Sequence, residues 1–98
     1  MKSIIQKNKE CYFCKDTRVE DHHIYFGANR KISEKNGFKV WLCNLHHTGS
    51  ISGISKYAVH FNKEKDLELK RLCQKKYEEK HTREEFIQLI GRNYIEEE

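Results

Sequence analysis

Two pairs of metal-ligand residues with the same two-residue gap stand out in this chain. Cys11 and Cys14 form one pair, and Cys43 and His46 form the other. A gap of two residues lets both side chains of a tight turn reach one ion, and two such turns complete the tetrahedron that structural zinc prefers. The fourth ligand is either His46 or the adjacent His47, and the spacing favours His46. The sequence therefore predicts a Cys3His site for a structural Zn2+ ion.

Histidines are the second set of residues that could do chemistry. His22, His23, His47 and His60 lie in the same half of the chain as the predicted zinc site. Neighbours on a strand point to opposite faces, so His22 and His23 can take different roles. One can bind an ion while the other accepts a proton, because histidine ionises near neutral pH and suits a general base. His81 lies in the other half and is predicted to be a solvated loop residue.

Composition favours one small domain that gains stability from a bound metal. Hydrophobic residues make up 37% of the 98 residues and charged residues 35%, against about 45–50% and about 25% in ordinary globular chains. The first ten residues hold no apolar run typical of a signal peptide, and no segment approaches a membrane span. We therefore expect a cytoplasmic protein without a membrane partner, in which close cysteine pairs hold metal.

Two short strands are predicted in the metal-binding half of the chain. Residues 18–26 and 38–43 mix β-branched and aromatic residues with polar ones, a pattern typical of strands. Residues 27–37 between them are predicted to form an irregular loop with a turn at its Asn-Gly pair. These segments must bring the cysteines and histidines together.

Two helices are predicted in the second half of the chain. Leu69, Leu72, Cys73 and Tyr77 fall on one helical face, so residues 66–80 should form an amphipathic helix with Cys73 as a buried core thiol. A capping box that begins at residue 82 and a glycine at residue 91 predict a second, shorter helix.

The cysteines and histidines occur within an ordered series of short segments. The segments that carry it are Cys11-x2-Cys14, Asp21-His22-His23-Ile24, Asn29-Arg30-Lys31, Leu42-Cys43-Asn44-Leu45-His46-His47, Val59-His60 and Phe86-Ile87-Gln88-Leu89-Ile90-Gly91-Arg92-Asn93-Tyr94. In this order they resemble the HNH (His-Me finger, ββα-metal) nuclease family. The resemblance is strongest to small HNH-like proteins of phages and prophages, and it covers roughly residues 11–94.

The resemblance implies a small α+β fold. Residues 11–62 would form a zinc-stapled ββα-metal core, and residues 63–95 would add two C-terminal helices, within a single domain of residues 1–98. It also implies a phage or prophage product in the cytoplasm of a bacterial host cell.

The resemblance also implies a role for each histidine of the first half. His23 would be the general base, and His22, His47 and His60 would hold one divalent ion such as Mg2+, Mn2+, Ni2+ or Zn2+. Asn29 would fix the loop of the catalytic site. His22 stands where the commoner form of the motif has aspartate, which shifts the metal preference towards the softer ions.

The expected function is hydrolysis of DNA phosphodiester bonds, with double-stranded DNA as the expected substrate. Arg30, Lys31 and Lys56 are predicted to neutralise phosphates, and the net charge of +4 favours a polyanionic partner weakly. The alternative is a zinc-containing nucleic-acid- or protein-binding module of phage origin without catalytic activity. The histidines outside the zinc set favour the enzyme, because a binding module does not need them. The oligomeric state stays open, with a homodimer as one alternative.

Overall fold

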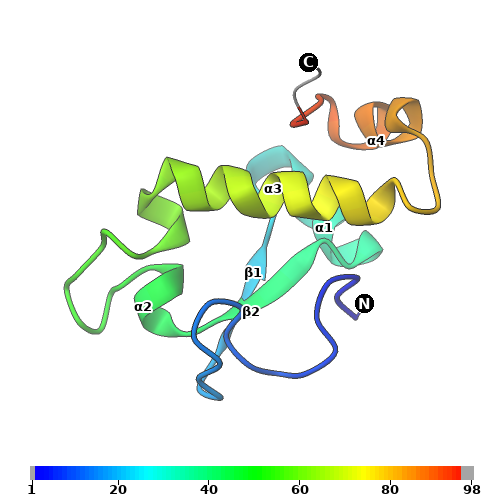
Figure 1. Ribbon diagram of the computed structural model, residues 1–98. Helices are drawn as coiled ribbons and strands as arrows, with labels where there is room; N and C mark the ends of the chain where they lie inside the picture. The colour runs from blue at the N-terminus through cyan, green and yellow to red at the C-terminus, as the bar shows by residue number, and fades with distance from the viewer. Residues whose placement is uncertain (1, 96–98) are drawn as a thin grey trace.

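A two-stranded sheet and four helices make up residues 2–95, the part of the chain that the computed structural model describes (Figure 1). Strands β1 (Glu20–His23) and β2 (Lys39–Leu42) pair antiparallel. The helices are α1 (Arg30–Asn36), α2 (Asn44–His47), α3 (Lys63–Tyr77) and α4 (Arg83–Ile90), with 3-10 helices at Gly27–Asn29 and Val59–Phe61. The α+β class and both strands are confirmed, and each strand is shorter than predicted.

The pairing of the two strands decides which way each β1 side chain points. His22 lies opposite Val40 in the register. Because side chains alternate along a strand, Glu20 and His22 share one face of the sheet, and Asp21 and His23 share the other. The neighbouring histidines are therefore directed to different surroundings.

The segment between the strands is helical, so the irregular loop predicted for residues 27–37 is wrong. Ser33 fixes α1 against the segment that follows β1, because its hydroxyl donates to the carbonyl of Tyr25 at 2.6 Å and accepts from the amide of Tyr25 at 3.1 Å. The helix ends at Gly37, which has a φ of 73°. A side chain there would collide with the backbone of Lys2. The Asn-Gly pair is therefore the C-terminal cap of a helix.

Both C-terminal helices are confirmed, although α3 lies nearer the N-terminus than the predicted residues 66–80. The Asn62 side chain accepts hydrogen bonds from the amides of Glu64 and Lys65, both at 3.1 Å, and so caps the start of α3. Helix α4 keeps the predicted capping box and glycine cap. No helix in the described part of the chain is long and apolar enough to cross a membrane.

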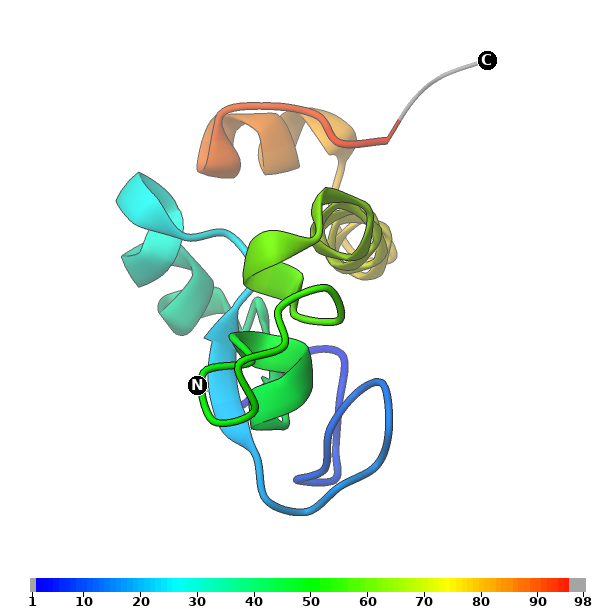
Figure 2. The same cartoon turned by 90° about the vertical axis from the view of Figure 1, so that its left-hand side faces the viewer.

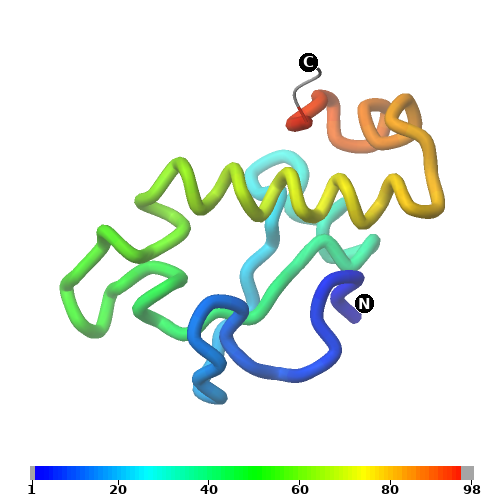
Figure 3. The backbone as a smooth tube through the Cα atoms, viewed as in Figure 1, coloured from blue at the N-terminus to red at the C-terminus, as the bar shows by residue number. Residues whose placement is uncertain are grey.

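Helix α3 crosses over the sheet, and α4 lies near the C-terminal end of α3 (Figures 1 and 3). The aromatic rings of Tyr25, Phe38 and Phe86 meet in the core, with the Tyr25 centroid 5.6 Å from Phe38 and 5.5 Å from Phe86. Cys73 is fully buried, and burial raises its pKa to about 12. The prediction that Cys73 is a core thiol is confirmed.

Candidate functional site

Side chains that could bind metal fall into two separate groups. The first contains Cys11, Cys14, Cys43 and His46, and the second contains His22, His47 and His60. Within each group the ligand atoms all lie within 4.8 Å of one another. The two neighbouring histidines of α2 therefore belong to different groups, which we call the Cys3His cluster and the three-histidine cluster.

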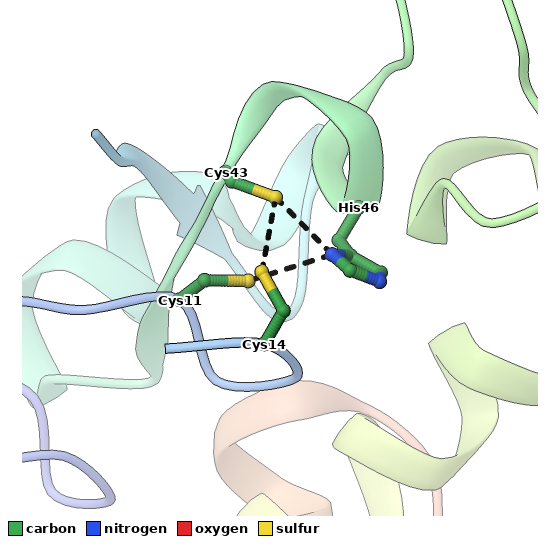
Figure 4. A group of neighbouring side chains, drawn as sticks. All are labelled: Cys11, Cys14, Cys43 and His46. Atoms are coloured by element: carbon green, nitrogen blue, oxygen red, sulfur yellow. Dashed lines mark hydrogen bonds between the residues drawn. The ribbon is translucent and has the colours of Figure 1, made fainter. Parts of the chain in front are cut away.

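The Cys3His cluster brings its four ligand atoms to about the spacing of a tetrahedral metal site (Figure 4). The sulfur atoms of Cys14 and Cys43 lie 3.6 Å apart. His46 Nδ1 lies 3.6 Å from the sulfur of Cys11 and 3.1 Å from that of Cys43. Usual zinc–sulfur and zinc–nitrogen lengths give a regular tetrahedron edges of about 3.6–3.8 Å. The cluster can therefore hold a structural metal such as zinc, and His46 is its histidine.

Backbone hydrogen bonds bring the two ligand turns together. The amide of Lys15 donates to the carbonyl of Cys11 at 2.9 Å, which closes the first turn. The amide of Tyr12 donates to the carbonyl of Trp41 at 2.9 Å, which attaches that turn to β2. Cys43 follows β2 directly and is the N-cap residue of α2. Both turns are thus fixed to the same strand, and their ligands meet.

Burial opposes ionisation of two thiols in this cluster, those of Cys11 and Cys43. It raises the pKa of Cys43 to about 11, and the neighbouring Cys14 and Cys11 add to the shift. Burial also raises the pKa of Cys11. Hydrogen bonds from backbone amides, which include those of Cys43 and Cys14, outweigh this effect and bring the pKa of Cys11 below its ordinary value. Three thiolates this close together repel one another, and a divalent cation would stabilise all three.

The three-histidine cluster has converging ring nitrogens. His60 Nε2 lies 3.1 Å from His47 Nε2, and the His22 ring centroid lies 5.0 Å from that of His60. His22 is 1% exposed, and its buried Nε2 has no hydrogen-bond partner in residues 2–95. Burial, followed by the neighbouring His47 and His60, lowers the pKa of His22 to about 3. The ring is therefore neutral at physiological pH, as a metal ligand must be.

Three different elements supply this cluster: β1, α2 and the 3-10 helix that holds His60. The loop after α2, in front in Figure 2, turns the chain back towards this 3-10 helix. Gly49 has a φ of 70°, and a side chain there would collide with the carbonyl oxygen of Ile54. The Asn44 side chain accepts from the amide of Ile51 at 2.8 Å and donates to the Ser50 hydroxyl at 3.0 Å. These contacts fix the loop that brings His60 to His47.

Glu20 is a residue of this site that the sequence analysis missed. Its Oε1 lies 2.8 Å from His47 Nδ1, and the Asn44 amide lies 3.4 Å from its Oε2. The hydrogen bond with His47 lowers the pKa of Glu20. A carboxylate on Nδ1 keeps the proton there and leaves Nε2 free towards the other histidines. The signal in the sequence was a carboxylate two residues before His22, on the same face of the strand.

His23 lies outside both clusters. Its Nε2 lies 3.2 Å from Glu34 Oε1 on α1, and Glu34 also accepts from Lys39 Nζ at 3.0 Å. Hydrogen bonds from Lys39 and then His23 lower the pKa of Glu34 to about 2. A neutral His23 that donates from Nε2 to this carboxylate keeps its Nδ1 unprotonated. Glu34 is a second residue that the sequence analysis missed.

The other predicted site residues lie on the surface or against α4. Arg30 and Lys31 are exposed in the first turn of α1, and Lys56 is exposed in the loop before His60. The side-chain amide of Asn29 donates to the carbonyl of Ile90 at 2.9 Å. Asn29 therefore ties the turn before α1 to the end of α4.

Comparisons with known proteins found no match for this chain. No protein-family model matches the chain, and no curated protein or solved structure matches it. The geometry alone characterises the chain as a small mixed α+β protein with a Cys3His cluster that can hold a structural metal such as zinc.

Proposed function

We propose that the protein is a metal-dependent endonuclease of the HNH (His-Me finger) kind that hydrolyses DNA phosphodiester bonds. The observation that carries this proposal is the three-histidine cluster, which is present in addition to the Cys3His cluster. A zinc-stapled module that only binds a partner needs no second set of converging ring nitrogens. Two paired strands followed by α2, with α1 inserted between the strands, support a ββα-metal core, because β1 carries His22 and α2 carries His47.

The three-histidine cluster is the proposed site of one divalent ion, such as Mg2+, Mn2+, Ni2+ or Zn2+. A bound ion neutralises charge on the scissile phosphate and stabilises the leaving oxygen. His22, His47 and His60 hold it through neutral ring nitrogens. The buried Nε2 of His22, which has no hydrogen-bond partner among the described residues, supports this role. Glu20 holds the His47 ring in the orientation that binding requires.

His23 is the proposed general base. It belongs to neither group of potential metal ligands, so its ring is not taken up by an ion and can accept a proton from water. Glu34 accepts from Nε2 of His23 and thereby leaves Nδ1 as the proton acceptor. Arg30, Lys31 and Lys56 are proposed to neutralise phosphates. Asn29 is proposed to hold the turn before α1 through its bond to α4.

Cleavage of supercoiled plasmid and of single-stranded circular DNA tests the proposal. We expect cleavage only when a divalent ion is added to the zinc-loaded protein. His60→Ala should lower activity, with partial recovery at high Mn2+ or Ni2+, because the ion site keeps two histidines. His81→Ala is the matched control, since His81 is exposed and stacks on Tyr77 with ring centroids 4.1 Å apart. No cleavage of either DNA with Mg2+, Mn2+, Ni2+ or Zn2+ would leave the binding module as the better description.

Removal of the Glu20 carboxylate should weaken the ion site without changing its ligands. Glu20→Ala is expected to lower the affinity of the three-histidine cluster by about 10- to 100-fold, as is typical when the partner of a metal-bound histidine is lost. Calorimetric titration of the zinc-loaded protein with Ni2+ measures the affinity. Asp21→Ala is the matched control, because it removes a carboxylate from the opposite face of the same strand. Equal Ni2+ affinity in the two variants would contradict the role of Glu20.

A further inference from the structure

Several large exposed apolar side chains belong to chain segments next to the three histidines of the three-histidine cluster. In residues 2–95 the large exposed ones are Phe26, Ile51, Ile54, Tyr57, Phe61 and Ile87. All but the last lie close in sequence to a histidine of the cluster. Single exposed apolar residues are normal on a protein surface, whereas a concentration at one place indicates an interaction site.

Three of these exposed side chains are aromatic. Phe26 is 45% exposed, and its ring centroid lies 5.8 Å from that of His60. Phe61 directly follows His60 and is 67% exposed, and in the described part of the chain its ring stacks on no other ring. Tyr57 precedes His60 by three residues and is 44% exposed. The three rings offer apolar faces in segments next to His22 and His60, and the Phe26 ring contacts His60 itself.

The same region carries positive charge. Lys70 Nζ lies 4.3 Å from the ring centroid of Phe26, although it also pairs with Asp66 at 2.7 Å. Lys56 Nζ lies 5.0 Å from the ring centroid of Tyr57. From residue 47 to residue 63 the chain has two lysines and no acidic residue. Cations beside exposed rings complement a polyanion that also has flat apolar groups.

We infer that the proposed nuclease acts on unpaired DNA strands, whose bases stack on Phe26 and Phe61. This inference rests on the proposed function and names its substrate class. In a duplex each base is covered by its neighbours, so an exposed ring stacks most readily on a base that is unpaired. Stacking on aromatic side chains and a positively charged surface are the usual means of binding single strands. The rings therefore favour single strands over the duplex DNA that the sequence suggested.

Binding measurements test the inference independently of cleavage. Fluorescence anisotropy with a labelled oligonucleotide compares the single strand with the duplex of the same sequence, in the His23→Ala background to prevent cutting. We expect the single strand to bind more tightly. Phe26→Leu and Phe61→Leu should each weaken single-strand binding about 5- to 100-fold and change duplex binding less than about twofold, because leucine keeps an apolar side chain but removes the ring. Ile87→Leu on α4 is the control and should bind like the parent.

Three outcomes would overturn the inference. One is duplex binding as tight as single-strand binding, and another is unchanged single-strand binding in both phenylalanine variants. The third is self-association in sedimentation that Phe61→Leu abolishes without affecting DNA binding, which would assign the rings to a second copy of the chain. If the protein prefers single strands but cleaves no DNA, the proposed nuclease activity is refuted, and the proposed surface for binding single strands is retained.

Discussion

Serine in place of Cys43 is expected to release zinc and unfold the first half of the protein. The Cys3His cluster joins the turn at Cys11 to the end of β2, and burial raises the pKa of Cys43 to about 11 when no cation stabilises its thiolate. Structural zinc contributes about 10–16 kcal/mol in small zinc-binding peptides, which exceeds or equals the roughly 5–15 kcal/mol stability of whole domains. Zinc content by mass spectrometry and thermal unfolding by circular dichroism measure the effect.

Two matched comparisons separate ligand loss from general damage. Cys73→Ala removes a thiol that is fully buried but lies outside the cluster, so it should keep one zinc per chain and lose little stability. His46→Ala should behave like Cys43→Ser, whereas the adjacent His47→Ala should keep its zinc. A folded wild-type protein without zinc, or a Cys43→Ser variant with an unchanged melting temperature, would contradict the prediction that zinc in the Cys3His cluster stabilises the protein.

The Cys3His cluster could be predicted because the two ligands of each pair lie close together in the sequence. Each ligand pair lies within four consecutive residues, and the gap between the ligands fixes the turn. The choice of His46 over His47 followed from the same gap. The helix α4 was predictable for a similar reason, since its capping box and glycine cap are sequence-local.

Helix α1 was missed because its own sequence gives little support. It spans seven residues, and Ile32 is the only large apolar one. Its position depends on the hydrogen bonds between Ser33 and Tyr25, a residue outside the helix in the segment that follows β1. Short helices of this kind owe their stability to tertiary contacts more than to propensity.

Glu20 and Glu34 were missed because each contact joins distant parts of the chain. Glu20 meets His47 across 27 positions, and Glu34 meets His23 across 11. Neither pairing is visible before the strand register and the position of α1 are known. Alternation along β1 explains both contacts afterwards, since Glu20 and His22 share one face and His23 faces the other.

Substitution of His23 is expected to remove cleavage and leave the rest of the molecule intact. Because general-base catalysis typically supplies about 10²–10⁴-fold in rate, His23→Ala should lower the cleavage rate constant by that factor. Zinc content and Ni2+ affinity should stay close to the wild-type values, since His23 belongs to neither metal-binding group. Single-turnover cleavage with saturating protein measures the chemical step without a contribution from binding.

A structural role of His23 must be separated from a catalytic one, because its ring also contacts Glu34 at 3.2 Å. His23→Gln keeps a side-chain amide that can donate to Glu34 but has no group that accepts a proton at neutral pH. If His23 is the base, the glutamine variant should fold as stably as the wild type and cleave as poorly as His23→Ala. If His23 only anchors α1, the glutamine variant should regain most of the activity. Cleavage near the wild-type rate in His23→Gln would therefore remove His23 from the mechanism, even in a protein that proves to be a nuclease.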